Sequence, residues 1–274
     1  MISDNTEWNS ILNVARELLS GFIFSDGILS EEDMRSQISK VVPIAERFKG
    51  KNSVLMEQVK DAVPGALYGV GTNLVFRGWY CPSPVLDITI GKTSRGRLRK
   101  DTPRSTEQDK IPYYRYLFDE KKRLICVCWC VNERTIKKEY LLYFPGYRLG
   151  ITYDDKGQLS AFTIELWEKH KIKMILRCLF HFYYGTPEEL IVERYYYRND
   201  AIYKMMYDKL TRPDWQEHAS HQSWQFRYRV EDGYYTGVAT RKAGDKTEPA
   251  DEDYWPIKIR RKVGDNVDDS MERI

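Results

Sequence analysis

The segment Arg123-Leu124-Ile125-Cys126-Val127-Cys128-Trp129-Cys130-Val131 contains the strongest structural signal in the chain. Side chains alternate between the two faces of a β-strand, so Cys126, Cys128 and Cys130 would share one face. The residues between them are also apolar, and a strand that is apolar on both faces is typical of the inside of a covered sheet. We therefore predict an internal strand whose cysteines pack in the core as small apolar side chains.

Similar segments follow one another from residue 111 to residue 210 and predict an antiparallel β-meander. The expected strands lie near residues 113–118, 123–131, 136–144, 147–153, 159–168, 171–182, 189–197 and 201–207. A hairpin at 224–230 and 234–241, which turns at Asp232-Gly233, and a last strand at 255–263 complete the pattern.

The apolar residues of the N-terminal part have helical spacing, and we expect helices at 8–22, 30–48 and 53–63. Ser30 and Asp33 form a capping-box pair at the start of the second helix. Pro43 within that helix predicts a kink or an early end. Beyond Ala66 the spacing changes to two, and residues 73–81 and 85–90 are predicted to form a pair of strands.

These patterns together predict an α+β fold. An N-terminal helical segment, residues 1–64, would accompany a large, curved antiparallel β-sheet domain at residues 65–263. The polar interval 91–110 is the expected loop and a candidate boundary between two subdomains, and residues 264–274 are expected to be a frayed tail.

Composition restricts the class of protein only in part. The 274 residues include 43 basic and 40 acidic side chains, so the net charge of +3 neither implies nor excludes nucleic-acid binding. No stretch reaches the roughly 20 apolar residues of a membrane span, so no membrane partner is expected. The five cysteines and the absence of a leader pattern in the first eight residues predict reduced thiols and a cytoplasmic location.

Two surfaces are candidates for binding. Tyrosine is abundant, with 20 residues, and rigid rings are enriched at protein interfaces. We predict a partner-binding face on the meander made of Tyr140, Tyr143, Tyr147, Tyr195 and Tyr197. The alternative site is the basic loop 92–104, whose Lys92, Arg95, Arg97 and Arg99 would contact nucleic-acid phosphates or an acidic protein.

The turn Tyr153-Asp154-Asp155-Lys156-Gly157-Gln158-Leu159 joins an aromatic strand end to an Asp-containing turn, a glycine and an apolar restart. Asp119 and Asp200 begin comparable turns without the glycine. In this pattern the stretch from residue 113 to residue 207 resembles the bacterial YD-repeat and MORN-like repeat proteins. Some of those relatives look like antitoxin or immunity proteins, so the resemblance implies a direct protein partner, such as a toxin.

The sequence contains no nucleophile, base and acid at catalytic spacing, and no cluster of metal ligands at the spacing of a metal site. We therefore predict no catalytic residues, metal or cofactor, and a non-catalytic binding protein of the immunity or antitoxin type. The alternative is a nucleic-acid-binding protein or nuclease that uses the basic loop. A third hypothesis is a small-molecule site lined by Cys178, Phe180 and Trp129.

Overall fold

The structure is a computed structural model. It describes residues 13, 27–60, 62, 67–91, 93–103, 112–181, 185–212, 219–242, 244 and 253–264. Apart from Asn13, the helix expected at 8–22 lies outside these residues, as do Lys92 and the tail beyond residue 264. The described part consists mainly of antiparallel β-sheet, with few helices.

In the described part of the chain, thirteen strands form one open, antiparallel sheet in the order β13-β12-β11-β10-β9-β8-β7-β6-β5-β4-β3-β1-β2. The strands are β1 Leu67–Val70, β2 Arg97–Arg99, β3 Tyr113–Phe118, β4 Leu124–Val131, β5 Arg134–Phe144, β6 Tyr147–Asp154, β7 Leu159–Glu168, β8 Lys171–Phe180, β9 Pro187–Arg198, β10 Ala201–Thr211, β11 Ser220–Glu231, β12 Tyr234–Lys242 and β13 Trp255–Lys262. From β3 to β13 each strand pairs with the next along the chain, which confirms the predicted meander. Strand ends differ from the expected ones by no more than four residues.

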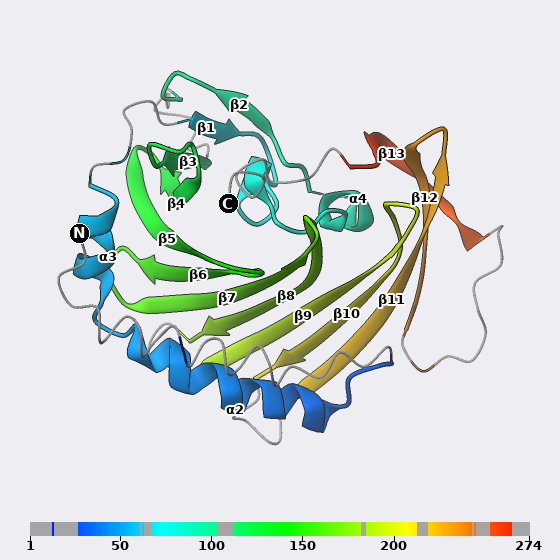
Figure 1. Ribbon diagram of the computed structural model, residues 1–274, viewed down its shortest axis with the longest axis horizontal. Coiled ribbons are helices and arrows are strands. Elements are labelled where there is room, and N and C mark those ends of the chain that lie inside the picture. Colours follow the sequence, from blue (N-terminus) through cyan, green and yellow to red (C-terminus); the bar gives the residue numbers. More distant parts are fainter. Residues whose placement is uncertain are drawn as a thin grey trace.

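The sheet is strongly curved and is covered on both faces (Figure 1). Helix α2, Glu31–Arg47, lies along the outside of the curve, and we call this side the outer face. A short 3-10 helix, η1 at Gly78–Tyr80, and helix α4 at Leu86–Ile90 lie within the curve, against the inner face. Helix α3, Asn52–Gln58, follows α2.

Helix α2 begins at the predicted capping box. The Ser30 side chain accepts a hydrogen bond from the Asp33 backbone N–H at 3.0 Å, and Asp33 Oδ2 accepts one from the Ser30 backbone N–H at 2.8 Å. Pro43 does not end the helix, which continues to Arg47. Burial of the apolar stripe on both sides of Pro43, including Val41 and Ala45, offsets the backbone hydrogen bond that proline cannot make.

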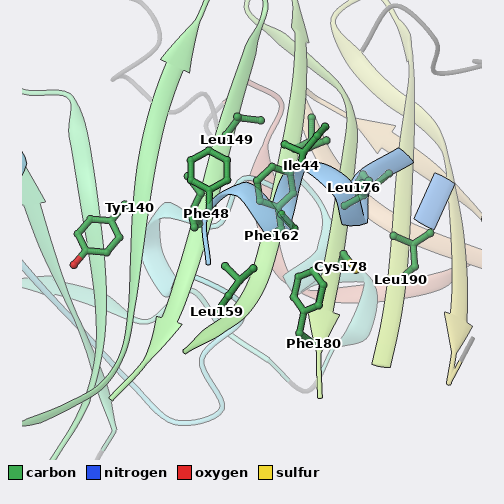
Figure 2. Packing of buried hydrophobic residues seen from close by; sticks show 14 of the residues in the cluster. Ile44, Phe48, Tyr140, Leu149, Leu159, Phe162, Leu176, Cys178, Phe180 and Leu190 are labelled. Atoms are coloured by element: carbon green, nitrogen blue, oxygen red, sulfur yellow. The ribbon is translucent and has the colours of Figure 1, made fainter. Parts of the chain in front are cut away.

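The main core lies between α2 and the outer face (Figure 2). Phe48, directly after α2, packs against Phe162 of β7 with ring centroids 5.9 Å apart. Cys126, Cys128 and Cys130 belong to this same core and are no more than 2% exposed. The prediction of an internal strand with buried thiols is confirmed, since β4 pairs with β3 on one side and β5 on the other.

The strand pair expected at 73–81 and 85–90 is wrong. Residues 73–90 contain η1 and α4 and cover the inner face instead of adding strands to the sheet; we call them the inner segment. The Val85 carbonyl accepts hydrogen bonds from both the backbone and the side chain of Thr89, which stabilises the single turn of α4. Several apolar residues of the inner segment are buried because this irregular segment packs on the sheet, and local spacing does not distinguish such a segment from a strand.

Candidate functional site

The five tyrosines predicted to form an exposed binding face do not do so. Tyr140, Tyr147 and Tyr195 are 1%, 5% and 3% exposed. Tyr140 and Tyr147 lie in the core of the outer face, while Tyr195 lies in the core of the inner face. Successive side chains of a strand point to opposite faces of the sheet, so these tyrosines do not all share one face. Because other segments cover both faces, the three rings pack in the core.

The other two tyrosines, Tyr143 and Tyr197, are partly buried at opposite parts of the inner face. The Tyr143 hydroxyl donates to the Leu124 carbonyl at 2.7 Å, and the Tyr197 hydroxyl donates to the Ile172 carbonyl at 2.9 Å. Both hydroxyls therefore stabilise neighbouring strands. Of the five rings, only Tyr197 lines a pocket described below.

The arginines of the predicted basic loop 92–104 do not all lie on the surface. Arg97 and Arg99 are exposed on edge strand β2, so part of the expected loop is a strand. Arg95 is only 9% exposed and donates to the carbonyls of Cys81, at 2.7 Å, and Ser83. The structure thus separates Arg95 from the exposed Arg97 and Arg99, because its guanidinium binds carbonyls of the inner segment.

A buried ion-pair network connects the inner segment to the centre of the sheet. Arg77 is fully buried and donates to both oxygens of Glu139, at 2.6 and 2.7 Å, and to Glu165 at 2.5 Å. Arg148 contacts the other oxygen of Glu165 at 2.6 Å. Gly150 leaves room for this arrangement, because a Cβ atom there would lie 2.1 Å from Glu139 Oε1.

The protonation of Arg77 is determined by its two carboxylates. Burial alone lowers the pKa of Arg77, but the charges of Glu139 and Glu165 outweigh this effect and raise the pKa above its ordinary value. The guanidinium is therefore a permanent cation, sealed from solvent. Such a group can anchor a segment, but it is not positioned to meet a ligand.

A second polar cluster fixes the segment further along the inner face. Tyr195 donates to the Glu193 carboxylate, and its hydroxyl also lies 2.6 Å from Ser83 Oγ. Burial raises the pKa of Glu193, and the hydrogen bonds from Tyr195 and Ser83 offset this only in part. Asp87 of α4 is held by Arg261 of β13 and lies 3.4 Å from Arg95 Nε, so the last strand is also tied to the inner segment.

A pocket of about 230 Å³ lies on the inner face, where the β7–β8 and β9–β10 turns meet the inner segment and the end of β13. Its lining residues are Pro84, Trp167, Lys169, His170, Lys171, Ile172, Tyr197, Asp200, Ile202, Tyr235 and Gly264. The small-molecule site predicted at Cys178, Phe180 and Trp129 is not this pocket. Cys178 and Phe180 belong to the core of the outer face.

The walls of the pocket are aromatic and aliphatic, and hydrogen bonds hold them. The Tyr235 hydroxyl accepts from the Ile202 backbone N–H at 3.0 Å, and Arg261 donates to the Pro84 carbonyl at 3.2 Å. Trp167 is 8% exposed, and its indole nitrogen has no hydrogen-bond partner within the described part of the chain. Hydrogen bonds therefore hold the aromatic and aliphatic walls around the pocket.

The rim of the pocket is basic. Lys169 and His170 are exposed, and Lys171 Nζ lies 2.5 Å from Asp200 Oδ1 and 5.3 Å from the centre of the Tyr197 ring. Lys173 Nζ is 5.6 Å from the same ring. The sequence predicted the turns that carry these groups, but it did not predict that the two turns line a pocket. Their proximity could have been inferred, because alternate turns of a meander lie at the same edge of the sheet.

Cys126 and Cys128 are buried thiols whose pKa values are shifted, and their Sγ atoms lie 3.8 Å apart. A hydrogen bond from Cys126 and the nearby charge of Arg115 lower the pKa of Cys128 to about 7, although burial acts in the opposite direction. The same hydrogen bond and burial raise the pKa of Cys126. Among the residues that the structure describes, no three His, Cys, Asp or Glu side chains are arranged to hold a metal ion.

Comparisons with known proteins identify no family for this chain. No protein-family model matches the chain, and no curated protein matches its sequence. Within the described ranges, no helix combines the length and the apolar character needed to cross a bilayer. The pocket between the two turns and the inner segment is thus the candidate functional site.

Proposed function

We propose that this is a non-catalytic binding protein that holds a small organic molecule in the pocket between Trp167, Tyr197 and Tyr235. The observation that carries this proposal is an apolar, concave site whose walls come from separate, well-packed elements. Ligand sites of proteins commonly combine apolar and aromatic walls with a few polar groups at one side.

The size of the pocket restricts the ligand. Sites for drug-sized molecules commonly enclose roughly 300–1,000 Å³, and this pocket is smaller, at about 230 Å³. A molecule with one or two rings would fit between the aromatic walls. Stacking on Tyr197 would add to the free energy gained from burial of the ring.

Substitution of one wall residue tests the proposal. We expect Tyr197→Ala to weaken binding of small bicyclic compounds about tenfold, because the ring loses a stacking surface and buried contact area. Ligand-detected NMR and titration calorimetry with a library of such compounds would measure the effect.

The matched control for this test is Tyr196→Ala. Tyr196 is adjacent in β9 but does not line the pocket, and its ring packs under Lys204. We expect this variant to bind compounds as the unaltered protein does. If the two variants bind equally well, or if no compound binds, the pocket is not a ligand site.

A protein partner of the immunity or antitoxin type is the second candidate. The sheet is open, and in the part of the chain that is described no strand pairs with the outer edge of β2, where Arg97 and Arg99 are exposed. A partner can add a strand to such an edge. The two arginines would attract an acidic strand.

Charge reversal on β2 tests this second candidate. We expect Arg97→Glu combined with Arg99→Glu to abolish recovery of a specific partner in a pull-down from native cells analysed by mass spectrometry. Unchanged recovery would exclude this edge as the binding surface. Retention on heparin that falls steeply with salt would favour the nucleic-acid alternative instead.

A further inference from the structure

We infer that the pocket selects organic anions, specifically a flat ring that bears a carboxylate or phosphate group, with the anion at Lys169, His170 and Lys171. This inference rests on the proposed function and adds the chemical class of the ligand. Three independent features of the rim support it: its charge, the weakness of its internal ion pairs, and the identity of its turn residues.

The rim carries an excess of positive charge. Lys171 pairs with Asp200 and Lys173 pairs with Glu168, so the charge of the exposed Lys169 remains. Among the described residues, Lys169 forms no ion pair. An anionic group at the mouth would therefore complete the charge balance while its ring occupies the apolar interior.

The existing ion pairs would not prevent binding of such an anion. In the Lys171–Asp200 pair the Asp200 side chain is 82% exposed, and in the Lys173–Glu168 pair the Glu168 side chain is 62% exposed. Exposed ion pairs contribute only about 0.2–1 kcal/mol each. Both lysines can therefore turn toward a ligand at little cost, and both already lie close to the Tyr197 ring.

The turn between β7 and β8 has unusual residues for its backbone conformation. Lys169 and His170 have φ angles of 48° and 63°, which glycine and asparagine adopt more readily than longer side chains. Three other two-residue turns with both φ angles positive contain at least one Asn or Gly residue: Asn132-Glu133, Asn199-Asp200 and Asp232-Gly233. The long Lys169 side chain stands at a position that disfavours it, which indicates a role other than turn formation.

Matched pairs of probes test the inference. We expect titration calorimetry to show that 1-naphthoate and 1-naphthyl phosphate bind at least about tenfold more tightly than 1-naphthamide and 1-naphthol, which have similar rings without the charge. The preference should shrink as the salt concentration rises from about 50 to about 300 mM, because the rim is exposed to screening. Inorganic phosphate alone should bind weakly, since it lacks the ring.

A double substitution separates the rim charge from the fold. Lys169→Asn with His170→Gly supplies the residues that this turn prefers, so the variant should be at least as stable as the unaltered protein. We expect it to lose the preference for anions and to retain binding of the amide. The matched control is Glu133→Gly in the β4–β5 turn, which should leave both affinities unchanged.

The outcomes distinguish this inference from the function on which it rests. Equal affinities for naphthoate and naphthamide, with a loss of both in Tyr197→Ala, would overturn the anion preference and retain the pocket. An anion preference that persists in the double variant would also overturn it. Binding of inorganic phosphate as tight as that of naphthyl phosphate would show an anion site without ring recognition, and no binding at all would remove both proposals.

Discussion

Glu165→Gln is expected to lower the free energy of unfolding by about 3–5 kcal/mol, which is typical when one partner of a buried ion pair is removed. Glu165 is completely buried and accepts hydrogen bonds from two buried cations, Arg77 at 2.5 Å and Arg148 at 2.9 Å. A glutamine has nearly the same shape but carries no charge. Arg77 would then keep only the carboxylate of Glu139, and Arg148 would lose the charge of Glu165, in a place that water does not reach.

Urea denaturation followed by circular dichroism would measure this loss, and Glu168→Gln is the matched control. It makes the same change on the same strand, but its side chain is 62% exposed and, among the residues that the structure describes, pairs only with Lys173. We expect the control to change stability by less than about 0.5 kcal/mol. Similar shifts of the denaturation midpoint in both variants would show that the network around Arg77 does not stabilise the fold.

Gly150→Ala is expected to lower the free energy of unfolding by about 3 kcal/mol, at the upper end of the range for overpacked cores. The new Cβ atom would lie 2.1 Å from Glu139 Oε1 and 2.7 Å from Arg77 Nη2. Neither group can retreat without breaking the paired hydrogen bonds between them, which are 2.6 and 2.7 Å long. The substitution therefore causes both a steric clash and the loss of a buried ion pair.

Gly27→Ala is the control for this second prediction, because no atom of the described residues lies within 4 Å of the Cβ it would add. Its effect should stay within about 0.5 kcal/mol. Thermal and urea denaturation of both variants would measure the difference. In a Glu139→Ala background the obstructing carboxylate is absent, so Gly150→Ala should cost less there; equal costs in the two backgrounds would contradict the steric explanation.

The Arg77 network could not be found from the sequence, and the reason is distance along the chain. Arg77 is 62 residues from Glu139 and 88 residues from Glu165, and it lies in a segment with no regular spacing. Nothing near Arg77 indicates that it will be buried. The other members of the network, Glu139, Arg148 and Glu165, lie on three adjacent strands. The alternation of these strands identifies one face, without showing that another segment covers that face.

The candidate site was predictable only in its parts. The turns near His170 and Asp200 follow from local sequence, and a meander places alternate turns at the same edge of the sheet. The pocket also needs Pro84, Tyr235 and Gly264, which come from the inner segment, β12 and the chain after β13. Those three meet the turns only because the sheet curves around the inner segment, and this curvature is a property of the whole assembly.

The sequence by itself determined the strands from β3 to β13, their turns and the start of α2. These features depend on interactions within a few residues: the two-residue alternation, the turn residues, and the hydrogen bonds between Ser30 and Asp33. Tertiary structure decided what covers each face. It buried Tyr140 and Tyr195 on opposite sides, used Arg95 to hold the inner segment, and formed the pocket, because alternation shows which side chains share a face but not which distant segment packs against it.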